Sequence, residues 1–225
     1  LVWWRLDSAG GVAGTTQSQD WDHVTGERSL DSSWSLAGVE RNLAADAAWR
    51  LLWRDGTSGG VAWWRLESTG YLRNATQGDG WDWVSESLTL DSRWRLAAVR
   101  HDVGGGGLAQ LVWQDSADGR PVFWALGSTG RLRNATQGQG WDYVADTLAV
   151  GSAWRVAGLL SNLAVDTAEH LDRLVWHNAS TGAVTYWRLD SSGRLLDTAL
   201  DSGWGRVAGT LTLSSGWECA GAISP

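Results

Sequence analysis

Three copies of one polar phrase contain the residue types in this sequence that are best suited to bind a ligand. The phrase reads GTTQSQDWDHV at 14–24, NATQGDGWDWV at 74–84 and NATQGQGWDYV at 134–144, so successive copies start 60 residues apart. Each copy has a glutamine, a tryptophan four residues later and an aspartate directly after the tryptophan. An indole face stacks on the C–H groups of a pyranose, while amide and carboxylate groups bind its hydroxyls. The combination predicts carbohydrate binding by Gln17, Trp21, Asp22, Gln77, Trp81, Asp82, Gln137, Trp141 and Asp142.

The same phrase also has a purely structural interpretation. The Trp-Asp pair can fill a gap between packed units, with the aspartate capping a turn, because loop tryptophans are often buried. The glycines within the phrase favour binding instead, since a residue without a side chain lets the backbone approach a ligand closely. These glycines are Gly78, Gly80, Gly138 and Gly140. The sequence leaves both interpretations open.

No arrangement typical of catalysis accompanies the phrase. The four histidines occupy unrelated repeat positions without metal-ligand spacing, and the single cysteine, Cys219, has no evident histidine partner. No GxSxG nucleophile motif occurs. Catalysis needs one asymmetric site, whereas equivalent copies suit multivalent binding. We therefore expect a binding protein, not an enzyme, without metal or cofactor, although an active site in the unrepeated loop 162–172 is compatible with the sequence.

The phrase belongs to a longer internal repeat, which must position it. Three families of short segments rich in Val, Leu and Trp recur between clusters of Gly, Ser, Asp and Asn. Such segments predict short strands joined by tight turns, with hairpins around Asp55–Gly60 and Asp115–Gly119. Most strand tryptophans should be core residues; Trp63 and Trp64, for example, should face opposite sides of one strand. The aligned tryptophans are Trp34, Trp94, Trp154 and Trp204, then Trp53, Trp113 and Trp176, then Trp4, Trp64, Trp124 and Trp187.

A repeat of this kind is typical of a β-propeller blade. We expect an all-β fold, one domain over 1–225, with four blades of about 50–63 residues. Leu1–Leu6 should pair in one blade with the strand beginning at Trp204, because joining the termini removes a free sheet edge. Truncation from a larger ring is the alternative. The expected blades are 34–93, 94–153, 154–203 and a closing blade of 204–225 with 1–33.

The repeat motifs resemble the bacterial FG-GAP or VCBS-like propeller repeats. The resemblance lies in RLLWRDGTSGGVAWWRLESTG, QLVWQDSADGRPVFWALGSTG and RLVWHNASTGAVTYWRLDSSG, each after a W-x-(L/V)-A-(G/A) strand, and it covers nearly the whole chain. It implies a secreted or cell-surface binding protein, since the family includes lectins and integrin-type domains. Family members usually carry a D-x-(D/N)-x-D-G calcium loop. The loops ERNLAADAAW, RHDVGGGGLAQ and SNLAVDTAEHLD lack its carboxylates, so we expect no calcium site there.

Composition narrows the range of partners. The net charge of −7, without an arginine cluster, disfavours nucleic acid. No apolar run approaches the roughly eighteen residues of a membrane span, so we expect no membrane insertion. The expected partner is a glycan. In the alternative class of function, the same aromatic loops contact a surface protein in an assembly, and a homo-oligomer is also compatible with the sequence.

Overall fold

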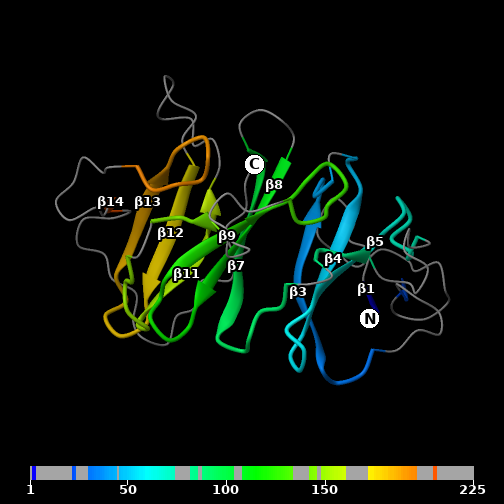
Figure 1. The fold of residues 1–225 in the computed structure, drawn as a ribbon, viewed down its shortest axis with the longest axis horizontal. Coiled ribbons are helices and arrows are strands. Elements are labelled where there is room, and N and C mark those ends of the chain that lie inside the picture. The colour runs from blue at the N-terminus through cyan, green and yellow to red at the C-terminus, as the bar shows by residue number, and fades with distance from the viewer. Residues whose placement is uncertain are drawn as a thin grey trace.

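The structure is a computed structural model, and it describes eleven stretches of the chain. These are residues 2–3, 22–23, 30–44, 46–73, 82–85, 88–103, 108–133, 142–145, 148–160, 172–196 and 205–206. Within these stretches the chain forms strands and turns and no helix. The strands make three four-stranded antiparallel sheets and one two-stranded sheet (Figure 1). The expected all-β class is confirmed.

Each large sheet is a meander whose strands pair in chain order. The first sheet contains β3 (Trp34–Arg41), β4 (Trp49–Asp55), β5 (Val61–Arg65) and β6 (Asp82–Trp83). The second sheet contains β7 (Trp94–Val103), β8 (Leu108–Asp115), β9 (Pro121–Ala125) and β10 (Asp142–Tyr143). The third sheet contains β11 (Trp154–Leu160), β12 (Asp172–Asn178), β13 (Val184–Leu189) and β14 (Gly205–Arg206). The small sheet pairs β1 (Val2–Trp3) with β2 (Asp22–His23).

Tight turns join the second and third strands of each large sheet. In the first sheet Asp55 N donates to Gly60 O at 2.9 Å, and the Asp55 carboxylate accepts a hydrogen bond from Thr57 N at 2.9 Å. Gly59 has φ 75°, and a Cβ there would collide with the backbone of Leu90, so the turn needs glycine at this position. The hairpins expected around Asp55–Gly60 and Asp115–Gly119 are confirmed.

The core lies between successive sheets, which stack face to face in chain order. Leu52 and Trp63 of the first sheet share a buried cluster with Trp113 of the second. Val112 of the second sheet shares another with Trp176 of the third. The second sheet therefore lies between the other two (Figure 1). In each sheet two neighbouring strands bring a pair of buried indoles together, with ring centroids 5.0 Å, 5.3 Å and 4.7 Å apart in Trp53–Trp64, Trp113–Trp124 and Trp176–Trp187.

Trp63 and Trp64 confirm that neighbouring strand tryptophans serve two faces. Trp63 belongs to the cluster between the first and second sheets, whereas Trp64 packs with Leu51 and Trp53 on the opposite face. In the first sheet, β4 and β5 therefore carry core residues on both faces. This is the arrangement expected of sheets that have a neighbour on each side.

The position of β14 corrects the alignment of the last repeat. Tyr186 pairs with Gly205 just as Trp63 pairs with Asp82 and Phe123 with Asp142. Gly205 thus follows the polar phrase in the third sheet, and the alignment of Trp204 with Trp34, Trp94 and Trp154 is wrong. The third unit accordingly extends beyond residue 203. Among the described residues β1 pairs with β2, whereas β14 pairs with β13, so the expectation that Leu1–Leu6 shares a blade with the strand beginning at Trp204 is wrong; residues 207–225 lie outside the described residues.

The corrected register moves the start of the next repeat to Trp217. Trp217 follows Trp204 by 13 residues, the spacing that separates Trp94 from Trp81 and Trp154 from Trp141. The intervening TLTLSSGW at 210–217 matches SLTLDSRW at 87–94. The sequence therefore contains four phrase tryptophans, Trp21, Trp81, Trp141 and Trp204, each followed 13 residues later by another tryptophan, namely Trp34, Trp94, Trp154 and Trp217.

Candidate binding surface

The polar phrases all lead into the same position of their sheets. The phrase at 74–84 leads from Arg73, whose N–H donates to Arg65 O at 2.9 Å, to the start of β6. The phrase at 134–144 leads in the same way from Arg133 to the start of β10, and the Arg133 N–H donates to Ala125 O at 2.8 Å. Since strands alternate in direction, the tight hairpins at 55–60 and 115–120 lie at the opposite end. We call the end with the phrases the phrase end.

Two of the predicted ligand-binding aspartates are buried. Asp82 is 1% exposed and Asp142 is 5% exposed, each at the first position of its fourth strand. A carboxylate is buried only where it is paired or hydrogen bonded, so these two side chains hold the end of the phrase against the sheet. Asp22 occupies the same register in the small sheet, opposite Trp3. The other predicted residues, Gln17, Trp21, Gln77, Trp81, Gln137 and Trp141, lie outside the described residues, and their contact with a ligand stays a prediction.

Each phrase lies beside a turn of the following sheet. Leu132 N of the second sheet donates to Val84 O at 2.7 Å, and Leu195 N of the third sheet donates to Val144 O at 2.7 Å. The turn residues before these leucines, 127–131 and 190–194, were not among the predicted site residues. The sequence does mark these turns, because a polar segment that contains glycine, GSTGR or DSSGR, recurs with the repeat. The last residue of each of these two phrases, Val84 or Val144, therefore has the next sheet's turn as a neighbour.

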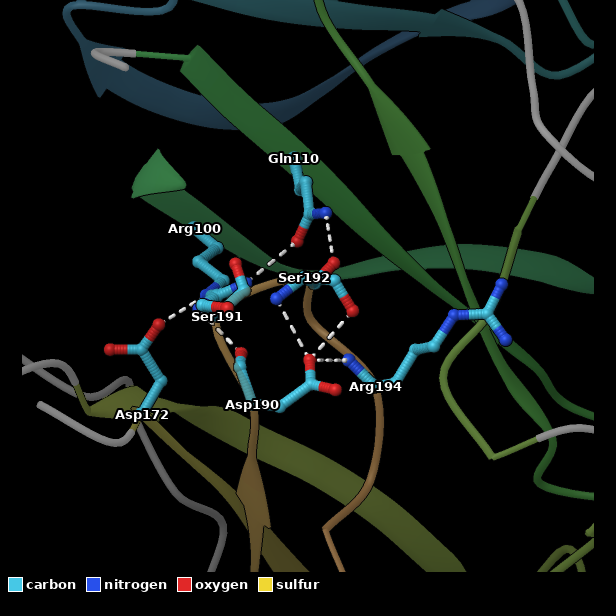
Figure 2. A network of polar contacts seen from close by, with 7 residues as sticks. All are labelled: Arg100, Gln110, Asp172, Asp190, Ser191, Ser192 and Arg194. Atoms are coloured by element: carbon cyan, nitrogen blue, oxygen red, sulfur yellow. Dashed lines mark hydrogen bonds and ion pairs between the residues drawn. The ribbon is translucent and has the colours of Figure 1, made fainter. Parts of the chain in front are cut away.

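A buried polar network fixes one of these turns (Figure 2). Arg100 on β7 is almost fully buried, and its Nε donates to the carboxylate of Asp172 on β12. Its guanidinium also donates to Asp190 O at 2.9 Å and to Ser191 O at 3.4 Å. Oε1 of Gln110 on β8 accepts a hydrogen bond from Nη1 of Arg100 at 3.2 Å. The second sheet thus supports both a strand and the turn of the third.

The turn itself is built around Asp190. Its Oδ1 accepts hydrogen bonds from Ser192 N at 2.8 Å and from Arg194 N at 3.0 Å. Burial works to raise the pKa of Asp190, but these hydrogen bonds outweigh it and the pKa is lowered, so the carboxylate stays ionised at neutral pH. Gly193 has φ 92°, and a Cβ there would collide with the Gln110 amide, which donates to Ser192 O at 2.8 Å.

The first sheet has different groups where the second has Arg100 and Gln110. Arg50, at the position of Gln110, donates hydrogen bonds from both Nη atoms to the Asp46 carboxylate at 2.7 Å, and Nη2 of Arg65 forms an ion pair with the same carboxylate at 3.1 Å. The hydrogen bond from Arg50 is the main cause that lowers the pKa of Asp46 to about 2. The Arg50 guanidinium also lies 4.4 Å from the Trp63 ring centroid. Glu40 occupies the repeat position of Arg100, and its Oε2 lies 3.0 Å from Nε2 of His101 on the second sheet.

These geometries describe a rigid support for loops. Within the described stretches, no three His, Cys, Asp or Glu side chains gather as metal ligands. Nor does any helix there have the length and apolarity to cross a membrane. Comparison with protein-family models, with curated proteins and with solved structures finds no match to this chain. The function must therefore be inferred from the chain's own residues.

Proposed function

We propose that this chain is a non-catalytic carbohydrate-binding protein that binds sugar units at the phrase end of its sheets. The observation that carries the proposal is the equivalent placement of Asp82 and Asp142 at the first position of the fourth strand. Two copies of one phrase thus enter their sheets in the same register, and Asp22 begins β2 in that register as well. Repeated sites of equal geometry suit an extended or branched glycan, because weak contacts add through effective concentration.

Each proposed site divides the work among the phrase residues. The tryptophan stacks on the sugar ring and the glutamine binds hydroxyls, whereas the aspartate, which is buried at Asp82 and Asp142, anchors the loop. The adjacent turn of the next sheet offers further hydrogen-bonding groups. The fourth phrase has Trp204, but Leu200 and Gly205 stand where the other copies have glutamine and aspartate. We therefore expect three competent sites and a fourth that lacks the polar partners.

We also propose a secreted or cell-surface β-propeller of four blades as the scaffold. Face-to-face stacking of sheets in chain order and the repeat of about 60 residues support this arrangement. The corrected register assigns β14 to the third blade, so the closing blade combines β1 and β2 with residues after β14. The alternative function is a protein-interaction module in a surface assembly, which uses the same loops.

A glycan array followed by calorimetry tests the function. The purified chain should bind a defined glycan with up to three sites, and Trp81→Ala should remove one site or weaken it by about 1–3 kcal/mol through lost contact area. Trp204→Ala is the matched control and should leave the number of strong sites unchanged. An array without any bound sugar would favour the assembly module. Early thermal unfolding of Trp81→Ala would instead show that the indole is a structural plug.

A further inference from the structure

The first sheet leaves an apolar edge exposed. Leu36, Val39 and Trp49 are 42%, 50% and 46% exposed, and together they are three of the four large hydrophobic residues exposed in the described stretches. Leu36 pairs with Trp53 and Val39 with Leu51, so both lie on the face that carries the buried cluster of these two partners. Trp49 precedes Leu51 by two strand positions and shares the face. We call these three residues the open edge.

The equivalent positions are covered in the third sheet. Val156, Leu159 and Asp172 occupy the positions of Leu36, Val39 and Trp49, and they are only 4%, 6% and 8% exposed. The first strand of the preceding sheet takes part in covering them, since Arg100 on β7 binds Asp172. At the junction between the first two sheets, Gly38 of β3 lies against Leu96 of β7 in the same way. The open edge is thus a surface from which a preceding first strand is missing.

The third sheet has a buried polar group without a described partner on its far face. Gln114 of the second sheet donates to Trp154 O at 2.7 Å and accepts from Val156 N at 3.0 Å, which ties β8 to the first strand of the next sheet. His177 occupies the position of Gln114 in the third sheet. Its side chain is 7% exposed, and its Nε2 has no hydrogen-bond partner. A buried ring nitrogen without a partner is costly, and the backbone of a following first strand would supply one.

We propose that residues 217–223 of this chain, which lie outside the described residues, form the first strand that covers the open edge and faces His177. The segment reads WECAGAI, and Trp217 stands at the repeat position of Trp34, Trp94 and Trp154. It would belong to the same unit as β1 and β2, which occupy the third- and fourth-strand positions of a sheet. No described strand occupies the second-strand position of that unit, so the segment would cover the open edge without pairing with β1 directly.

The side chains of this segment match the open edge position by position. Gly221 stands at the position of Gly38, where a Cβ would come within 3.3 Å of Leu96 Cδ2, so a small residue is favoured opposite Leu36. Ile223 stands at the position of Arg100 and therefore opposite Trp49. The second junction has an ion pair there, Arg100 with Asp172, and in this proposal two apolar residues, Ile223 and Trp49, take its place. An apolar side chain opposite the half-exposed Trp49 would remove apolar surface from water.

The native cysteine provides a test that needs no substitution. Cys219 stands at the repeat position of Leu96 and Val156, which face the preceding sheet. We expect its reaction with a thiol reagent to be slower by about 100-fold or more in the native protein than in denaturant, because burial protects it. Equal rates in both conditions would overturn the proposal.

Cross-linking tests the occupant directly. In a Cys219→Ser background, Leu36→Cys with Gly221→Cys should be joined by a short bismaleimide within one chain, as peptide mass spectrometry of mixed isotope-labelled and unlabelled protein reports. Leu148→Cys with Gly221→Cys is the matched control, because Leu148 is equally exposed but lies outside the open edge, and it should stay unlinked. Links between labelled and unlabelled chains would show that a second copy covers the edge, and absence of any link would also refute the proposal. This proposal rests on the proposed propeller scaffold, but neither experiment involves sugar binding, so it and the carbohydrate-binding function can fail separately.

Discussion

Removing Arg100 should destabilise the protein more than any exposed charge does. Arg100 and Asp172 have side chains only 4% and 11% exposed, so Arg100→Met leaves a nearly buried carboxylate without its cation. Removing one partner of a buried ion pair costs about 3–5 kcal/mol. The loss should lie at the upper end of that range, because Asp190 O and Ser191 O also lose their donor.

The assay is urea unfolding followed by tryptophan fluorescence, with the double variant Arg100→Met/Asp172→Leu included. Removing both charges should recover part of the loss, so the two substitutions should couple by about 1–3 kcal/mol. Arg120→Met is the control: it breaks the pair with Asp118, in which both side chains are one-third exposed, and should cost less than about 1 kcal/mol. Additive effects, or a loss for Arg100→Met no larger than that of the control, would refute the buried-network argument.

Three further predictions address the supports of the phrase end. Gly193→Ala should cost at least about 1–2 kcal/mol in unfolding free energy, because φ at this position is 92° and L-residues avoid that region; an unchanged urea midpoint would contradict it. The pKa of Asp46 is depressed from 3.8 to about 2, so its stabilisation is present above pH 3.8 and is lost as pH falls toward 2. Asp46→Asn should therefore flatten the pH dependence of stability in that interval, which acid titration followed by fluorescence measures. Ile223→Asp should lower the melting temperature more in the wild-type background than in the Trp49→Ala background, because the second background has already lost the apolar contact. Equal losses in the two backgrounds would show that Ile223 and Trp49 are not in contact.

The sequence predicted most of the local structure because the signals were local. Val- and Trp-rich segments between turn residues gave strands, and Asp55 and Asp115 with glycines four residues later gave hairpins. The alignment of Trp204 failed because WGRVAG and WECAGA are both similar to a first strand. The pairing of Gly205 with Tyr186 decides between them. The 13-residue spacing from Trp204 to Trp217 and the match of TLTLSSGW to SLTLDSRW agree with that pairing.

The junction chemistry could not be predicted from the repeat. Arg100 and Asp172 are 72 residues apart, and their counterparts Glu40 and Ala109 offer no ion pair that would suggest it. The burial of Asp82 was equally hidden, since an aspartate after a loop tryptophan fits a sugar site and a turn cap alike. Contacts that break the repeat become visible only when the sheets are placed together.

The contrast between phrases and junctions also bears on function. The phrases at 74–84 and 134–144 are identical at nine of eleven positions, whereas the first strands at 34–43 and 94–103 agree at four of ten. Buried contacts vary from junction to junction, as Trp49 and Asp172 show, because each interface needs only a complementary pair. Packing inside each sheet also keeps its residues from copy to copy, as the buried pairs Trp53–Trp64 and Trp113–Trp124 show. The Gln and Trp shared by the phrases therefore fit both a common ligand and a common plug, and the Trp81→Ala experiment separates the two.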